Sequence, residues 1–169
     1  MGWTVSESLP TYRPSLSYGL EVADVEPLQE LFAKYAGRAQ DEAFDLAVRR
    51  FNSAYTRSNA EDRLIDYWVA LEALFLPDTQ EELSYRIALR LAAFCGDEGD
   101  SRIRYFDDAR ESYKARSRVI HGRAVARLDE ITAATEQMVR VSLGRWIDPT
   151  RDHNPDFLEK FLLRNGSSE

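Results

Sequence analysis

The chain contains little cysteine and histidine and no long apolar run. Cys95 is the only cysteine in 169 residues, so it cannot form an internal disulfide. With two histidines and no Cys-x-x-Cys pair, the sequence lacks the ligand spacing of a zinc site, and we expect neither a metal nor a cofactor. No apolar stretch approaches the roughly 18–20 residues that span a bilayer, and the N-terminal MGWTVSESLP lacks the layout of a signal peptide. We therefore expect a cytoplasmic protein without a membrane partner.

The charge of the chain is acidic in total but unevenly distributed. Hydrophobic residues make up 44% and charged residues 30%, which is typical of a soluble globular protein of about one domain, with or without an arm. The net charge of −7 argues against a general nucleic-acid coat protein. Residues 102–127, however, carry eight Lys and Arg against three Asp and Glu, so this stripe has a charge of +5 and the remainder −12. A local basic stripe on an acidic body is therefore the feature to explain.

The pattern of apolar residues predicts an all-α protein. Residues 1–40 contain Pro10, Pro14 and Pro27 and the short alternating segment LSYGLEV, and we interpret them as an N-terminal arm or the remnant of an upstream domain, with a short helix near 27–35. Helical spacing then predicts helices over 41–57, 58–76, 79–95, 102–120 and 129–146. Short connections favour antiparallel neighbours, so we expect a helical bundle over residues 41–148, followed by a short helix and tail over 149–169.

Capping signals and apolar stripes support these boundaries. Ser58 with Glu61, and Thr79 with Glu82, have the spacing of capping boxes, and Asn154 precedes a proline that opens the last helix. Gly122 is placed to adopt the left-handed conformation just past the helix over 102–120. The expected core residues are Phe44, Ala47, Val48, Phe51, Tyr55, Leu64, Trp68, Leu71, Phe75, Leu83, Ile87, Leu91, Phe94, Ile103, Phe106, Tyr113, Ile131, Met138, Val141, Trp146, Phe157, Phe161 and Leu162. We also assign Tyr85 to the core in preference to a base-stacking role.

The segment YKARSRVIHGRAVAR, residues 113–127, holds the pair that could carry chemistry. Arg116 and His121 are five positions apart, which on a continuous helix is about 140° around the axis and about 7.5 Å along it. They can meet only if the helix ends at Gly122 or if a second copy takes part. A histidine can move the proton of a ribose 2′-hydroxyl or of the leaving oxygen, while an arginine stabilises charge on the phosphate, so the pair could cleave RNA without metal.

Simpler interpretations of these residues remain open. Cations at the end of a helix are favourable for its macrodipole alone, and the Arg-x-x-x-x-His spacing by itself is a weak motif. Glu72 borders an apolar stripe, where it could orient Arg116 or Arg86, or could form a structural ion pair with Arg86 or Arg90. We favour the structural ion pair.

Three segments in order, RLIDYWVALEALFLPD, LSYRIALRLAAFCGD and YFDDARESYKARSRVIHGRAV, resemble the HEPN superfamily and most closely its Apea-like branch. The resemblance covers about residues 41–146. It implies a helical bundle that pairs with a second HEPN unit, so that the Arg-x(4–6)-His segments of both form a metal-independent endoribonuclease site. Arg116 and His121 match that motif, whereas Ser117 stands where many active members carry Asn, Asp or His.

The leading hypothesis is therefore an endoribonuclease that cleaves by 2′-hydroxyl attack and leaves a 2′,3′-cyclic phosphate, in phage defence or a toxin system. Arg116 and His121 would be catalytic, Glu72 and Ser117 would support them, and the expected RNA-binding residues are Arg110, Lys114, Arg118 and Arg123. The expected partners are RNA, a second copy through the Arg116/His121 helix region, and an antitoxin or upstream domain. The alternative is a non-catalytic HEPN dimerisation or RNA- or nucleotide-binding module of a larger protein, an interpretation based on Ser117 and the acidic body.

Overall fold

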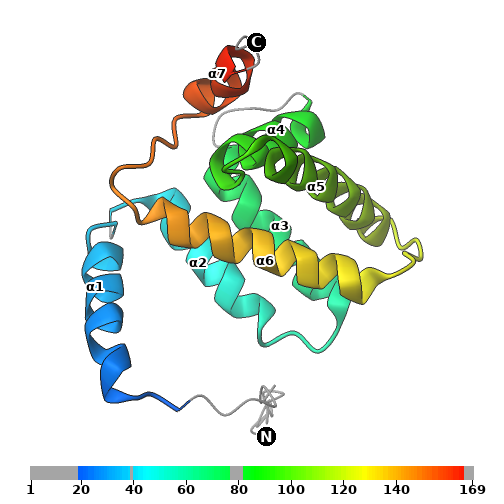
Figure 1. The fold of residues 1–169 in the computed structure, drawn as a ribbon. Helices are drawn as coiled ribbons and strands as arrows, with labels where there is room; N and C mark the ends of the chain where they lie inside the picture. The colour runs from blue at the N-terminus through cyan, green and yellow to red at the C-terminus, as the bar shows by residue number, and fades with distance from the viewer. Residues whose placement is uncertain (1–18, 39, 77–81, 166–169) are drawn as a thin grey trace, which may run out of the picture.

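The computed structural model describes residues 19–38, 40–76 and 82–165, and in these ranges the chain is helical with no strand (Figure 1). The elements are η1 (Val22–Asp24), α1 (Val25–Ala36), α2 (Glu42–Ala54), α3 (Ala60–Phe75), α4 (Leu83–Cys95), α5 (Gly99–Ile120), α6 (Leu128–Trp146) and α7 (Pro155–Asn165). The predicted all-α class is confirmed.

Helices α2 to α6 pack together as a bundle. The most extensive pairings join α2 to α3, α4 to α5 and α3 to α6, while α7 lies against α4. Figure 1 shows α6 running across the face of the bundle and α1 standing beside it. Helix α5, which carries most of the basic stripe, thus has one side against α4, α6 and α3 and the other in solvent.

The core lies around α3, whose predicted apolar stripe is buried along its length. Leu64, Trp68, Leu71 and Phe75 are each no more than 1% exposed. Fully burying one such side chain contributes about 1.5–3 kcal/mol to folding. Trp146 of α6 packs edge-on against Phe75, at 5.7 Å between ring centroids, which joins the last bundle helix to the core.

Two buried polar clusters tie the bundle together. The indole Nε1 of Trp68 donates to the Ser112 hydroxyl at 2.9 Å, and Ser112 shares a hydrogen bond with Thr135, which links α3, α5 and α6. On the other side of α3, the carboxylate of Asp66 is 3% exposed and accepts from Arg50 at 3.1 Å and Arg57 at 2.8 Å. Buried polar groups are tolerated when they are paired in this way.

Several predicted boundaries shift by a few residues. Asn59, not Ser58, caps α3, since its side chain accepts from the Asp62 N–H at 2.7 Å. Helix α5 begins at Gly99, earlier than predicted, and Glu98 with Ser101 forms its capping box. The predicted cap Thr79 lies outside the described residues.

Other boundary predictions are confirmed or corrected by their caps. The side chain of Asn154 accepts from the Asp156 N–H at 2.9 Å, so the predicted cap of α7 is confirmed. Glu82 was predicted to lie in the first turn of its helix, but it precedes α4 as the N-cap, with φ at 51° and no side-chain cap hydrogen bond, so α4 begins later than predicted.

Exposure corrects three core assignments and describes α1. Ile103 is 62%, Tyr85 50% and Phe157 39% exposed, so none of the three belongs to the core. Helix α1 buries no residue, and Phe32 on its apolar side is 63% exposed. A ring contact between Tyr35 and Phe44, at 5.8 Å between centroids, connects this helix to α2. The arm thus includes a regular helix whose apolar residues are left exposed apart from this one contact.

Candidate functional site

Helix α5 ends in a turn in which His121 is the C-cap, directly after Ile120. Gly122 has φ at +66°, the left-handed conformation that glycine adopts without a Cβ penalty. The Gly122 N–H donates to the Val119 carbonyl and the Arg123 N–H to the Arg118 carbonyl, each at 2.9 Å. These two bonds form a Schellman motif. The helix-ending role predicted for Gly122 is therefore confirmed.

Arg116 lies on the inner side of α5, against α3. Its Nη2 is 3.2 Å from Oε1 of Glu72, and the guanidinium carbon lies 5.4 Å from the centroid of the Tyr113 ring. The side chain is only 22% exposed, and its Nε is buried without a hydrogen-bond partner. Arg116 is thus fixed by one carboxylate and one ring and retains a donor that is not used within the described chain.

Glu72 is the counter-charge of Arg116, and the structural ion pair that we favoured for it is wrong. Arg86 and Arg90 pair instead with Glu159 of α7, at 3.2 and 2.7 Å. Burial raises the pKa of the Glu72 carboxyl, and the charge of Arg116 lowers it by less. The carboxylate therefore holds Arg116 in position while its own charge is unfavourably desolvated.

One copy of the chain does not bring Arg116 and His121 together. Arg116 faces Glu72, whereas the side chain of His121 is exposed and makes no hydrogen bond with the described residues. The angle of about 140° between positions five apart explains the separation, because α5 stays helical up to His121. Ser117 is half-buried between them, and its carbonyl accepts from the His121 N–H at 3.2 Å.

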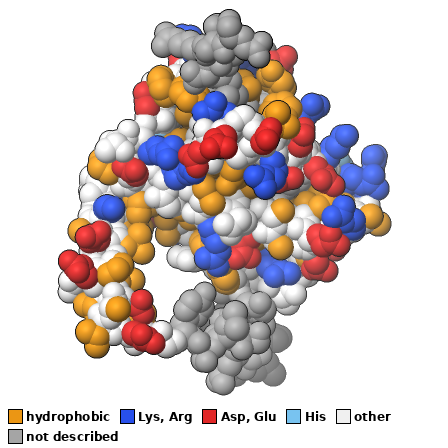
Figure 2. All heavy atoms as spheres, in the orientation of Figure 1, with side chains coloured by type: hydrophobic (Ala, Val, Ile, Leu, Met, Phe, Trp, Pro, Cys, Tyr) orange, Lys and Arg blue, Asp and Glu red, His pale blue; other side chains and the backbone are white. Residues whose placement is uncertain are grey.

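The predicted RNA-binding residues lie on the solvent side of α5 and in the turn after it. Arg110, Lys114, Arg118 and Arg123 are all exposed. Arg118 also donates to the Ala124 carbonyl at 2.8 Å, so it braces the turn. Figure 2 shows Lys and Arg side chains gathered at the right edge of the molecule, where α5 ends in Figure 1.

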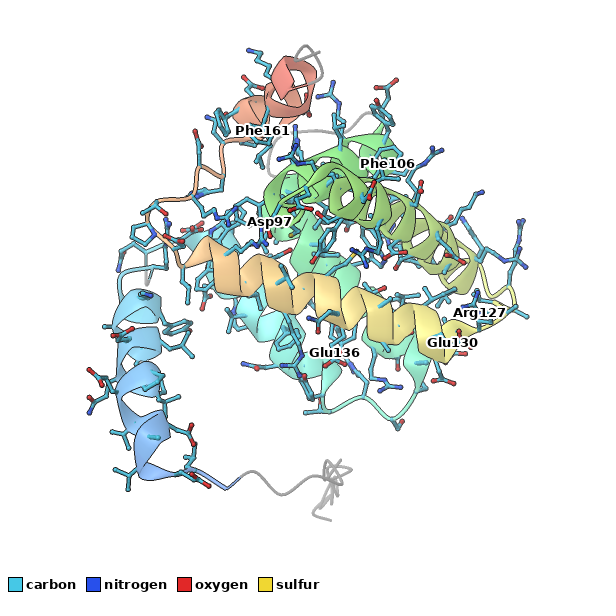
Figure 3. The ribbon with its side chains drawn as sticks, viewed as in Figure 1. Asp97, Phe106, Arg127, Glu130, Glu136 and Phe161 are labelled. Atoms are coloured by element: carbon cyan, nitrogen blue, oxygen red, sulfur yellow. The ribbon has the colours of Figure 1, made fainter. Side chains whose placement is uncertain are left out.

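The basic stripe is partly neutralised at its end. Arg127 donates to Glu130 at 2.6 Å across the start of α6, and Figure 3 shows the two side chains together there. Burial and the neighbouring Glu111 raise the pKa of Asp108, which lies on the side of α5 that faces α6. The cations available to a ligand are consequently those on the outer side of α5 and in the turn at Gly122.

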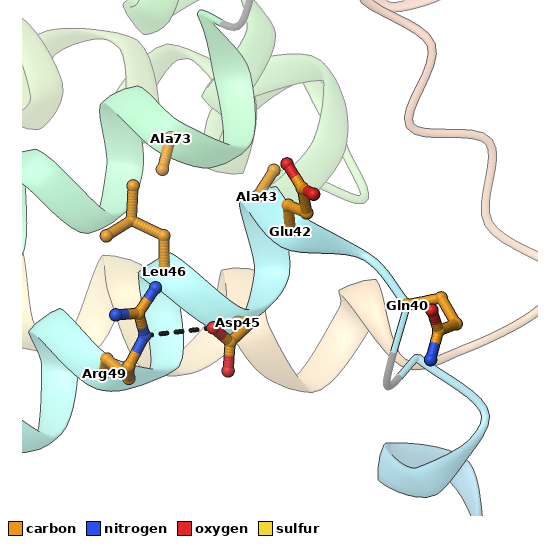
Figure 4. A pocket seen from close by; sticks show the side chains of 7 residues that line it. All are labelled: Gln40, Glu42, Ala43, Asp45, Leu46, Arg49 and Ala73. Carbon is orange, nitrogen blue, oxygen red and sulfur yellow. Dashed lines mark ion pairs between the residues drawn. The ribbon is translucent and has the colours of Figure 1, made fainter.

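A separate hollow of about 700 Å³ opens on α2, and its lining includes none of the predicted site residues. Its apolar floor comes from Ala43, Leu46 and Ala73, and Arg49 pairs with Asp45 at its rim, 3.0 Å apart (Figure 4). Among the residues that the structure describes, no group of three His, Cys, Asp or Glu is arranged to hold a metal ion.

Comparisons with protein-family models, with curated proteins and with solved structures give no significant match. Within the described ranges, no helix combines the length and the apolar character needed to cross a bilayer.

Sequence reasoning missed the exposed ring of Tyr85 and the role of Glu159. Tyr85 is two positions after Leu83, which on a helix is about 200° around the axis from the stripe of Leu83 and Ile87, so the spacing could have identified it as exposed. Glu159 lies on α7, far along the chain from its partners Arg86 and Arg90. No short-range pattern could have found that pairing.

Proposed function

We propose that this chain is a metal-independent endoribonuclease of HEPN type that acts as a homodimer. The observation that carries the proposal is the arrangement at the end of α5. There a half-buried arginine is held by Glu72, and an exposed histidine ends the same helix at the Gly122 turn. An arginine that stabilises charge on a phosphate and a histidine that transfers a proton are two of the groups that cleavage by 2′-hydroxyl attack uses.

In the proposed reaction, the ribose 2′-oxygen forms a bond to the adjacent phosphorus and the bond to the 5′-oxygen breaks. The 2′-hydroxyl loses its proton to the neutral imidazole of His121 in the second copy, and His121 of the first copy gives a proton to the departing 5′-oxygen. The products are a 2′,3′-cyclic phosphate and a 5′-hydroxyl. Arg116 binds the phosphate oxygens as charge builds on them. A helix C-terminus favours protonated imidazole, which supports His121 as the proton donor.

A dimer is part of the proposal because Arg116 and His121 face different ways in one copy. Two α5 ends meeting around a two-fold axis would bring a histidine of each copy toward the other. Ile120, next to His121, is 50% exposed, and an apolar side chain beside the site fits a contact between copies. A phage-defence or toxin role, with an antitoxin or upstream domain as regulator, remains part of this proposal.

The test is cleavage of single-stranded RNA by purified dimer in the presence of EDTA. The parent is expected to cut and to leave cyclic phosphate ends. Arg116→Ala and His121→Ala are expected to lose at least about 100-fold in rate. Arg49→Ala, an exposed arginine on α2, serves as the matched control and keeps full activity. Uncut RNA, or variants as active as the parent, would refute the proposal.

A second candidate is a non-catalytic RNA- or nucleotide-binding module. The separation of Arg116 from His121 in one copy favours it, because the cations of α5 could bind phosphates without assembling a reaction site. RNA affinity would then fall steeply with salt, with a log–log slope of about −0.7 for each phosphate contacted, and His121→Ala would leave binding intact. Such binding without cleavage would select this candidate.

A further inference from the structure

An aromatic pair lies where α4 and α5 meet, with the ring of Tyr85 exposed and the ring of Phe106 partly buried against the core. Tyr85 of α4 is 50% exposed and packs edge-on against Phe106 of α5, at 5.8 Å between ring centroids. The guanidinium carbon of Arg110 lies 5.6 Å from the centroid of the Phe106 ring. Figure 3 labels Phe106 at the outer edge of the bundle. Two rings and a planar cation thus share one solvent-facing patch.

This patch lies on the same side of α5 as His121, whereas Arg116 faces α3. Positions 106, 110, 114, 117 and 121 follow one another at steps of three or four, so they form one row along the helix. Phe106 and His121 are separated by about 22 Å along the axis, because each residue rises 1.5 Å. The row begins at the aromatic pair, passes the cations Arg110 and Lys114, and ends at His121.

The chemistry of the row fits single-stranded RNA. Proteins bind single strands with aromatic rings and arginine planes that stack on bases, combined with cations that follow the phosphates. Arg110 and Lys114 are exposed and can contact phosphates beside the rings. Two exposed acids of the same helix, Asp107 and Glu111, lie next to Phe106 and Arg110, so cations and acids alternate around the patch. A base-paired strand would hide its ring faces from Tyr85.

We propose that Tyr85, Phe106 and Arg110 form a platform that stacks an unpaired base several nucleotides from the cleaved linkage. This inference rests on the proposed ribonuclease function, and it makes the substrate single-stranded over the length of α5. Tyr85 supplies most of the accessible ring, Phe106 supports it, and Arg110 is placed to stack on the base or to bind the adjacent phosphate.

The test compares binding of the intact dimer to two oligonucleotides that cannot be cleaved. One is a 2′-O-methyl oligoadenylate and the other has the same backbone with abasic positions. Tyr85→Leu is expected to weaken binding of the oligoadenylate about 5- to 100-fold, as measured by fluorescence anisotropy, and to leave the abasic strand unchanged. Tyr85→Trp is expected to bind the oligoadenylate as tightly as the parent, because tryptophan also presents an aromatic ring. Tyr35→Leu, an exposed tyrosine on α1, is the matched control.

The outcomes separate this inference from the proposed function. If Tyr85→Leu leaves oligoadenylate binding unchanged, or weakens both strands equally, the platform is refuted while the cleavage tests on Arg116 and His121 stand. Loss of the dimer in sedimentation, without loss of affinity, would assign the patch to a protein contact and also refute the platform. RNA binding that depends on Tyr85 without any cleavage would support the platform and refute the ribonuclease. A parent that binds neither strand would refute the platform, while the cleavage of RNA in EDTA would still decide the ribonuclease.

Discussion

Replacing Glu72 by glutamine is expected to raise the stability of the protein at neutral pH. Burial raises the pKa of this carboxyl more than Arg116 lowers it, so the ionised form is less stable in the folded chain than in the unfolded one. Glutamine has nearly the same shape and resembles the protonated acid. The substitution therefore removes an unfavourable charge and keeps the contact with Arg116.

The pH dependence gives this prediction its sign. A carboxyl whose folded pKa is raised contributes stability that is complete below its ordinary pKa of 4.5 and is lost as the pH rises through the folded value. The gain from Glu72→Gln should consequently be absent below about pH 4.5 and grow toward neutral pH. The side chains of Arg116 and Glu72 are 22% and 26% exposed, so their ion pair is intermediate between a surface pair and a buried pair. We therefore expect a gain of about 0.5–1.5 kcal/mol, or about 1–5 °C in Tm.

Thermal and urea unfolding between pH 4 and 8 would measure the effect, with Glu30→Gln on exposed α1 as the control. The counterpart is Arg116→Met, which leaves the Glu72 carboxylate without its cation and is expected to cost about 1–2 kcal/mol at pH 7. That cost should shrink when Glu72→Gln is added, which a double-mutant cycle detects. A Glu72→Gln protein that is less stable than the parent at every pH would refute the reasoning, because the pair would then be net stabilising.

Two further predictions concern the bundle. Asp66→Asn should lower the free energy of unfolding, measured in urea, by about 2–3 kcal/mol, because a 3% exposed carboxylate loses its charge between two arginines. The control is Asp45→Asn at an exposed ion pair, which should change the free energy of unfolding by less than about 0.5 kcal/mol. Equal effects would contradict the role of burial. Gly122→Ala should lower the free energy of unfolding by about 1 kcal/mol because φ is +66°; no atom lies within 4 Å of the added Cβ, so the cost comes from the backbone and not from a clash. Gly144→Ala in α6 should raise the free energy of unfolding by about 0.5–1 kcal/mol in the same assay. A neutral Gly122→Ala protein would show that the turn does not need glycine.

Local sequence patterns predicted the helices well, but they could not predict which side chains pair between helices that are distant in the sequence. The stripe on α3 and the glycine at the end of α5 are local signals, set by the period of a helix and by the steric freedom of one residue. Glu72 was recognised as needing a cation, but its partner depends on how α3 lies against α5. The N-terminus of α3 was misplaced by one residue because Ser58 and Asn59 are both good caps.

The candidate site was predicted in part for the same reason. The sequence identified Arg116 and His121 as a pair that could meet if the helix ended at Gly122 or if a second copy took part. The helix does end there, but it stays helical up to His121, so the turn alone does not bring the two side chains together. Their catalytic roles stay predictions. The exposed ring of Tyr85 was misassigned because an aromatic residue was taken for core without checking its angle from the neighbouring stripe.

The hydrogen bond between Trp68 and Ser112 has a consequence for Arg116. Glu72 follows Trp68 by four residues and Arg116 follows Ser112 by four, so the charged pair lies one turn beyond the neutral pair on each helix. A buried indole and a hydroxyl thus set the register at which the guanidinium reaches the carboxylate. Substitutions at Glu72 or Arg116 can consequently change the charge of the site without shifting α5 along α3. The position of the site and its electrostatics therefore depend on different residues.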